Sequence, residues 1–292
     1  NHSSAASDVY KRQVIEFYTN SCMVLSEEKT YNCMTSKNHE VAVGDNVEIL
    51  VQSSNAIISK IHDRSSALYR FRGQRKRLLA ANLTNIGIIL ASVPQAPRLF
   101  IDKWLTIADG AKLEPFLVFN KSDLELSQEF EDTKDLYANL NLPYFITSFK
   151  ENFGIPELKN YLENRTCIFV GQSGVGKSSL TGALTGINLK TKVLSNEQGQ
   201  HTTSTSRLFK VENVDGSIID SPGVRDIEQG PVSKSSIKSV FHEITEASKK
   251  CQFRNCGHKK DKGCFVKEGI KEGLINQSRY DLSLIHISEP TR

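Results

Sequence analysis

Apolar and polar positions follow two different patterns along the chain, and the change falls near residue 85. Before it, short runs rich in β-branched and aromatic residues alternate with polar turn residues, which predicts short strands. These runs lie at residues 14–17, 22–25, 29–34, 47–51 and 57–61, with a turn at 43–47. Together they predict a small OB-type β-barrel, although an SH3-like barrel would give the same pattern.

After residue 85, longer apolar runs alternate with helical stretches. The predicted strands are residues 86–93, 116–119, 144–147, 167–170 and 217–219, and the predicted helices are residues 100–111, 128–140, 155–162 and 177–185. Continuous apolar strands separated by helices are typical of a parallel sheet covered on both faces, the α/β class. Because ligands bind beyond the carboxyl ends of such strands, motifs that follow a strand are candidate binding residues.

A Gly-rich loop follows the predicted strand 167–170 and precedes a predicted helix. It matches the P-loop pattern G-x-x-x-x-G-K-[ST] in the context that this motif requires. Backbone N–H groups of such a loop wrap phosphates, and the helix start adds positive potential. Lys177 is expected to bridge the β- and γ-phosphates, and the Ser178 hydroxyl to bind Mg²⁺. The candidate nucleotide-binding residues here are Gly171, Gln172, Ser173, Gly174, Val175, Gly176, Lys177, Ser178 and Ser179.

The tetrapeptide Asn120-Lys-Ser-Asp123 follows another predicted strand and matches the N-K-x-D guanine motif of GTPases. The Asp123 carboxylate can accept from guanine N1–H and the exocyclic amine, a pair of donors that adenine lacks. Asn120 is expected to tie this loop to the P-loop, and Lys121 to cover the base. Ser148 stands where a Ser-Ala-Lys motif would help to hold guanine, with Phe149 in place of Ala.

Two further segments match the magnesium and γ-phosphate motifs of GTPases. Asp220-Ser-Pro-Gly223 follows a predicted strand and matches D-x-x-G, in which Asp220 acts on Mg²⁺ through water and the Gly223 N–H senses the γ-phosphate. The polar run 195–206 lies where switch I belongs and predicts a loop that orders on nucleotide binding. Thr202 or Thr203 is expected to complete the Mg²⁺ shell, and Thr203 joins Ser178 as a candidate magnesium ligand.

The order of these motifs differs from that of ordinary GTPases, in which the P-loop comes first and N-K-x-D follows D-x-x-G. Here the N-K-x-D and Ser148 motifs precede the P-loop, switch I and D-x-x-G. The sequence therefore predicts a circularly permuted GTPase, because strands pair in space rather than in sequence order. The chain then continues directly from D-x-x-G, so a movement of switch II would pull on the C-terminal segment.

Three cysteines and one histidine lie close together near the C-terminal end: Cys251, Cys256, His258 and Cys264. Three thiolates and an imidazole suit one closed tetrahedral Zn²⁺ site of the structural type. The Lys-rich residues between them cannot build an apolar core, so metal would supply the local folding energy. Unrelated free cysteines are the alternative interpretation. The other three cysteines, Cys22, Cys33 and Cys167, lie in predicted strands and are expected to be buried packing residues.

Charge is distributed unevenly, although the whole chain carries 37 Lys and Arg against 33 Asp and Glu. Residues 60–77 have a net charge of +6 and residues 248–282 of +5, whereas residues 78–247 have −4. Two basic segments around an acidic middle favour a polyanionic partner, most simply nucleic acid, over two unrelated solvated surfaces. The composition excludes a disordered or collagen-like chain, and six cysteines in 292 residues do not make a disulfide scaffold.

The permuted motifs, an N-terminal barrel and the Cys-x4-Cys-x-His-x5-Cys cluster together resemble the RsgA (YjeQ) family of GTPases that depend on the small ribosomal subunit. The resemblance implies an OB-fold at 14–72, a circularly permuted P-loop GTPase domain at 73–231 and a zinc-binding domain at 232–282. It also implies GTP and GDP as ligands, Mg²⁺ with GTP, and one structural Zn²⁺. The implied function is late maturation of the 30S subunit, with GTP hydrolysis stimulated by that subunit and contacts to its rRNA.

The catalytic residue is less clearly marked than the binding residues. Val224 follows D-x-x-G where many GTPases have Gln, and an apolar side chain cannot orient water. His201 is therefore the candidate that orients the attacking water, as the resemblance also implies. An rRNA contact or an ordinary loop residue is the alternative. Two other functions stay open: a nucleotide-gated rRNA-binding switch in which hydrolysis only resets binding, and a permuted GTPase that acts on another ribosomal assembly intermediate.

Both ends of the sequence look foreign to the protein. Residues 1–13 and 283–292 resemble translated sequencing-library adapter, so we expect scars there; ordinary disordered tails are the alternative. The longest apolar run, residues 86–93, is far shorter than the ~20 residues needed to cross a bilayer. We therefore expect a cytoplasmic protein without a membrane partner, and a monomer.

Overall fold

The computed structural model describes residues 12–18, 20–27, 29–35, 40–52, 55–73, 75–138, 140–187, 205–226 and 233–288. The chain divides into two compact units, each assembled from segments that are separate in the sequence. The first unit comprises residues 1–84, 158–169 and 178–227, and the second comprises residues 85–157, 170–177 and 228–292. No helix among the described residues is long and apolar enough to span a membrane.

The N-terminal part of the first unit is a five-stranded structure with the predicted strands. The strands are β1 (Gln13–Phe17), β2 (Ser21–Ser26), β3 (Lys29–Met34), β4 (Val47–Gln52) and β5 (Asn55–Ile61). Their order is β1-β2-β3-β5-β4, with β3 parallel to β5 and the other neighbours antiparallel. A bridge between Gln13 and Asn46 brings the residue before β4 back to β1.

Alternation along these strands explains the buried core of the five-stranded structure. Residues of opposite parity face opposite sides of a strand, so Cys22 and Val24 of β2 point inward together. Cys22 pairs with Cys33 of β3, and the side chains of Cys22, Val24 and Cys33 are fully buried. Cys22, Cys33 and Cys167 are thus buried as predicted, and burial raises the pKa of the Cys22 thiol to about 12.

A two-stranded hairpin follows that the sequence analysis did not predict. It consists of β6 (Ala67–Arg72) and β7 (Arg75–Ala81), joined at Gly73, whose φ of 59° favours glycine. The segment Ala-Leu-Tyr-Arg-Phe-Arg does alternate, but its arginines made it look like a charged surface segment. Lys76 lies over the Tyr69 ring at 4.9 Å, so apolar and basic residues pair across the hairpin.

The rest of the first unit continues the same sheet. Its strands are β11 (Thr166–Val170), β12 (Ser206–Lys210) and β13 (Ser217–Asp220), followed by the short 3-10 helix η1 (Pro222–Asp226); helix α4 (Lys177–Thr185) belongs to it from Ser178 onward. β11 and β13 are parallel as predicted, whereas β12 is antiparallel to β13. β12 also pairs with β1, where Arg207 lies 3.6 Å from Glu16. The five N-terminal strands and these strands therefore form one continuous sheet.

The second unit contains a parallel three-stranded sheet in the order β10-β9-β8. The strands are β8 (Asn85–Leu90), β9 (Glu114–Asn120) and β10 (Tyr144–Thr147). Every residue of β8 is buried, as expected for a strand covered on both faces. Helices α1 (Arg98–Gly110) and α2 (Gln128–Ala138) follow β8 and β9, and the chain passes between the two units within α3 (Ile155–Tyr161). The predicted alternation of strands and helices is confirmed.

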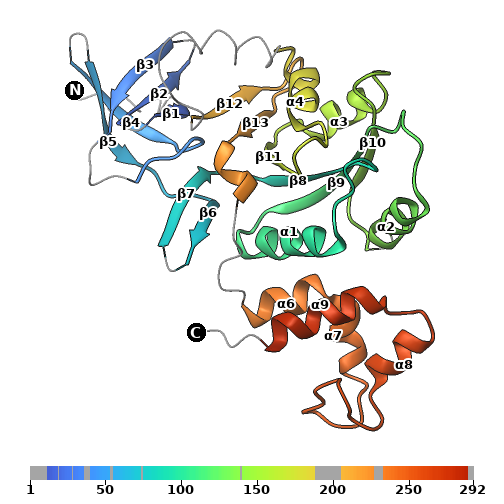
Figure 1. The fold of residues 1–292 in the computed structure, drawn as a ribbon. Coiled ribbons are helices and arrows are strands. Elements are labelled where there is room, and N and C mark those ends of the chain that lie inside the picture. The colour runs from blue at the N-terminus through green and yellow to red at the C-terminus, as the bar shows by residue number, and fades with distance from the viewer. Residues whose placement is uncertain are drawn as a thin grey trace, which may run out of the picture. The chain divides into compact units, whose positions relative to one another are not determined.

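Among the described residues, the second unit is completed by the helices α6 (Lys234–Val240), α7 (His242–Ser248), α8 (Phe265–Lys271) and α9 (Gln277–Ser288). Ser233 caps α6 by accepting a hydrogen bond from the Ser236 N–H. Figure 1 shows α6 and α9 beside α1, and both contact that helix. Their own apolar cluster includes Phe241, Val266 and Tyr280.

The predicted domain borders can be placed relative to the helices and strands. The border at 72/73 lies in the turn of the β6–β7 hairpin, and the border at 231/232 lies outside the described residues. The predicted scar 1–13 ends at Gln13, the first residue of β1, which pairs with Leu25 of β2. The predicted scar 283–292 begins at Ser283, which is buried in α9. The domain borders and the scars stay predictions.

Candidate functional site

The P-loop begins where β11 ends and leads into α4. Gly176 has a φ of 98°, and a Cβ there would lie 2.4 Å from the side-chain nitrogen of Asn120. Gly171 closely approaches the backbone of β8, since a Cβ would lie 2.7 Å from the Ile89 carbonyl oxygen. Both positions exclude a side chain, so these glycines allow the loop to take its shape.

Lys177 folds back over the loop that precedes it. Its Nζ atom donates hydrogen bonds of 2.6 Å to the carbonyl oxygens of Gly171 and Gln172. The ammonium group is thus held above the loop where the predicted phosphates would lie. Val175 is buried within the loop, which anchors its centre.

The guanine motif is fixed to the P-loop by a buried side chain. Asn120 ends β9, is 2% exposed, and donates from Nδ2 to the carbonyl oxygen of Val175 at 2.8 Å. Its Oδ1 accepts from the Thr147 hydroxyl at 3.0 Å, which fixes which way the amide faces. The expected tie between the two loops is present, and Thr147 is a participant that the sequence analysis missed.

Asp123 is placed by two neighbours that converge on its carboxylate. Ser148 donates to Oδ1 at 2.7 Å, and the Lys150 ammonium lies 3.8 Å from Oδ2. The hydrogen bond from Ser148, then a backbone hydrogen bond and the Lys150 and Lys121 charges, hold the pKa of Asp123 below its ordinary value. The group is an ionised acceptor at neutral pH, as recognition of guanine donors requires.

Lys121 is held in an unusual backbone conformation, with a φ of 62°. Its Nζ donates to the carbonyl oxygen of Val93 at 2.7 Å, and the side chain of Val93 is exposed. The bend after β8 therefore supports the guanine loop. The sequence analysis had no signal for this contact, because a backbone acceptor can belong to any residue type.

The first unit carries the remaining motif residues. Ser178 and Ser179 lie in the first turn of α4, and Asp220 ends β13. β11 and β13 are parallel neighbours, so their carboxyl ends lie at one edge of the sheet. Gly223 lies in η1, where a Cβ would approach Leu79 to 2.8 Å, and Val224 beside it is buried. The role of water orientation, predicted for His201 because Val224 is apolar, stays a prediction.

The predicted switch I residues, His201, Thr202 and Thr203 among them, lie outside the described residues. Their assignments stay predictions.

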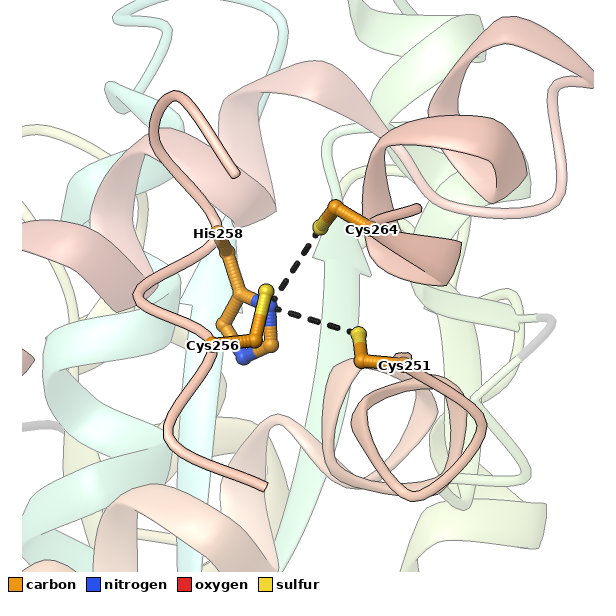
Figure 2. Close-up of side chains that lie close together, drawn as sticks. All are labelled: Cys251, Cys256, His258 and Cys264. Carbon is orange, nitrogen blue, oxygen red and sulfur yellow. Dashed lines mark hydrogen bonds between the residues drawn. The ribbon is translucent and has the colours of Figure 1, made fainter. Parts of the chain in front are cut away.

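The four predicted metal ligands converge in the second unit (Figure 2). The ligand atoms of Cys251, Cys256, His258 and Cys264 all lie within 4.8 Å of one another. His258 presents Nδ1 to the cluster, 3.7 Å from the Cys251 sulfur and 3.5 Å from the Cys264 sulfur. A tetrahedral zinc ion, with metal–sulfur bonds of about 2.3 Å, separates its ligand atoms by roughly 3.5–3.8 Å. The cluster is thus suited to a metal ion of that size.

A P-loop, an N-K-x-D loop hydrogen-bonded to it and a D-x-x-G motif after a parallel strand define a GTPase of the P-loop class, with its motifs circularly permuted. A family model described as RsgA GTPase matches residues 61–229, more than half of the chain. The chain belongs to the RsgA GTPase family and is a hydrolase that acts on GTP.

Named relatives agree with this assignment. The chain is 36% identical over 251 residues to "Small ribosomal subunit biogenesis GTPase RsgA 2" of Bacteroides thetaiotaomicron, covering 82% of this chain and 81% of that protein. It is 37% identical to a Pectobacterium atrosepticum protein named "Small ribosomal subunit biogenesis GTPase RsgA", covering 78% and 67% of the two chains.

Two solved structures share the fold. YjeQ from Thermotoga maritima matches with a TM-score of 0.72 and 27% identity, covering 96% of this chain and 99% of that one. A structure described as "YloQ, a circularly permuted GTPase" covers both chains completely, with a TM-score of 0.69 and 21% identity.

Proposed function

We propose that this protein binds the small (30S) ribosomal subunit, assists its late maturation, and hydrolyses GTP to GDP and phosphate faster when bound to that subunit. The observation that carries the proposal is the 36% identity over 251 residues to a relative named for small-subunit biogenesis. Such a likeness spans both units rather than the nucleotide motifs alone.

Guanine selection is assigned to Asn120, Lys121, Asp123 and Ser148. It is supported by the hydrogen bond from Ser148 to Asp123 and by the bond that ties Asn120 to the P-loop. Phosphate binding is assigned to the P-loop residues from Gly171 to Ser179. Mg²⁺, which accompanies GTP, would be held by Ser178 and Thr203, with Asp220 acting through water and Gly223 sensing the γ-phosphate. In this arrangement the protein positions groups and stabilises charge rather than forming covalent bonds.

One structural Zn²⁺ is assigned to Cys251, Cys256, His258 and Cys264. Three soft thiolates and one imidazole match zinc better than a hard cation such as Mg²⁺. When bound, the ion supplies folding energy to a segment that is otherwise mostly exposed, from residue 252 to residue 263.

The five-stranded part is assigned to the OB type, supported by its strand order, the parallel β3–β5 pair and the bridge from Gln13 to Asn46. An rRNA partner is supported by two groups of exposed cations. They are Arg75, Lys76 and Arg77 on the hairpin, and Lys259, Lys260 and Lys262 in the metal loop. We infer a cytoplasmic monomer, in keeping with a ribosomal partner.

Co-sedimentation with separated 30S and 50S subunits, with GTP or GDP, tests the proposal. We expect binding to 30S that depends on the nucleotide and weakens as salt rises. Preferential binding to 50S would replace the proposal with a GTPase of another assembly intermediate.

The rate of GTP hydrolysis distinguishes a catalytic role from a nucleotide-gated binding switch. His201→Ala, measured with saturating 30S, should lower the hydrolysis rate if His201 orients water, and an unchanged rate removes that assignment. If a non-hydrolysable GTP analogue supports both binding and subunit maturation, while blocking only release, hydrolysis merely resets a binding switch.

A further inference from the structure

Arg279 on α9 is almost completely buried, with 1% of its surface exposed. Its guanidinium donates to Asp102 on α1 at 2.5 Å and to Glu243 on α7 at 2.6 and 3.2 Å. It also donates to the Val240 carbonyl oxygen at 2.7 Å and lies 4.8 Å from the Phe241 ring centre. One side chain thus joins a helix of the GTPase domain to three C-terminal helices.

Asp102, the partner of Arg279, is connected through α2 to β9, the strand that ends at the guanine motif. Asp102 is fully buried, and its second oxygen accepts from the Tyr137 hydroxyl on α2 at 2.8 Å. α2 packs on β9 through an edge-to-face contact between Phe130 and Phe119, with ring centres 5.7 Å apart. Phe119 is the residue before Asn120, so the contact chain from α9 ends next to the guanine motif.

The next residue on α9 reaches the metal loop instead. Successive helix residues point about 100° apart, so Tyr280 faces a different side from Arg279. Its hydroxyl donates to the carbonyl oxygen of His258 at 2.6 Å. His258 has a φ of 60°, a left-handed conformation that surrounding contacts must hold in place. Tyr280 therefore orients the backbone of a proposed metal ligand.

We propose that α9 couples the metal loop, residues 251–264, to the GTPase helix α1. Tyr280 makes the contact to the loop and Arg279 makes the contact to α1, so metal binding stabilises the Arg279–Asp102 contact and metal loss weakens it. The inference rests on the proposed metal centre. It means that the C-terminal helices are held by α1 as well as by their chain connection after D-x-x-G.

The buried Arg279–Asp102 ion pair favours a single arrangement of α9 on α1. A buried ion pair adds little net stability, since desolvation offsets the attraction, but it penalises every arrangement in which a charge is left unpaired. Here both Asp102 oxygens and three Arg279 nitrogens have partners, so one orientation of α9 on α1 is strongly preferred. Coupling between two sites is reciprocal, so disturbing either contact must change the other.

The test uses the full-length protein loaded with zinc and two readouts, zinc affinity and hydrogen exchange of the α1 amides. Tyr280→Phe should weaken zinc binding about 10-fold, the loss typical of a residue that supports a metal ligand. Stripping zinc from the unmodified protein should speed α1 exchange, and this effect should shrink in Tyr280→Phe. Arg279→Lys keeps the charge, but an ammonium group cannot bond Asp102 and Glu243 in the same geometry as the guanidinium. Hydrogen exchange of the α1 amides should therefore be faster even with zinc bound.

Asp281→Asn is the matched control, because Asp281 is exposed on the same helix and the amide keeps the bond from Gln277. Zinc affinity of Tyr280→Phe equal to that of this control would overturn the loop contact. Unchanged α1 exchange after zinc removal would overturn the coupling while leaving the metal centre intact. Protein that binds no zinc at all would refute the metal centre, and the coupling with it.

Discussion

Asn120 donates a hydrogen bond from its side-chain amide to the carbonyl oxygen of Val175, 55 residues further along the chain, at a distance of 2.8 Å. The bond is buried and joins the guanine loop to the P-loop. Its geometry shows why the permuted order does not matter to the site: the loops follow two strands, and only their spatial proximity is required.

Asn120→Ala should weaken GTP and GDP binding together, by roughly 10- to 100-fold, because the loops lose their connection and two buried groups lose a partner. An unpaired buried group costs about 1–3 kcal/mol, so thermal stability should fall as well. Isothermal titration and thermal unfolding measure the two effects. Asn160→Ala, which removes an exposed amide on α3, should leave both unchanged.

Asp123→Asn should change the base that is recognised. The carboxylate accepts from two guanine donors, whereas an amide presents one donor and one acceptor. GTP affinity should fall by roughly 100-fold or more, and xanthosine triphosphate, which has a carbonyl in place of the exocyclic amine, should bind better than GTP. Competition binding with both nucleotides checks this. A variant that still prefers GTP would remove Asp123 from base recognition.

Asp102 should make stability depend on pH in a defined window. Burial raises its pKa to about 6 against an attraction to Arg279 that lowers it, while the unfolded value is 3.8. Between these values the folded chain holds a proton that the unfolded chain releases, so its contribution to stability is lost as pH rises from about 4 to 6. The contribution is about 2–3 kcal/mol.

Denaturant unfolding of the unmodified protein and Asp102→Asn across that pH window isolates this contribution by difference. The variant should lack the decline that Asp102 causes, and Glu129→Gln, an exposed change on α2, should retain it. Parallel curves for the unmodified protein and Asp102→Asn would show that Asp102 does not titrate there.

Cys264→Ser should abolish stoichiometric zinc and loosen the C-terminal helices. Cys264 precedes α8 and belongs to the same apolar cluster as Phe241 and Tyr280, so a lost metal bond also disturbs packing. Metal analysis and proteolysis of the C-terminal segment measure both effects. Cys22→Ala removes a buried thiol of the five-stranded part and should keep one zinc per chain, although it lowers stability through lost packing.

The candidate site was predictable where residue type decides the chemistry. The P-loop, Asn120, Asp123, Ser148 and the four metal ligands carry recognisable side chains at recognisable spacings. Thr147 and the Val93 carbonyl were not predictable, because a threonine in a strand and a backbone oxygen have no distinctive pattern. The hairpin from Ala67 to Ala81 was missed since its cations concealed its alternation.

The sequence alone determined the class of chemistry, the permuted order of the motifs and the succession of strands and helices, because these depend on residue types and periodicity that are local in the chain. Only the tertiary structure decided the pairing of β1 with β12 and the burial of Arg279 against Asp102, which lies 177 residues away. A contact of that kind depends on which surfaces meet when the helices pack. No local pattern in either segment encodes that meeting.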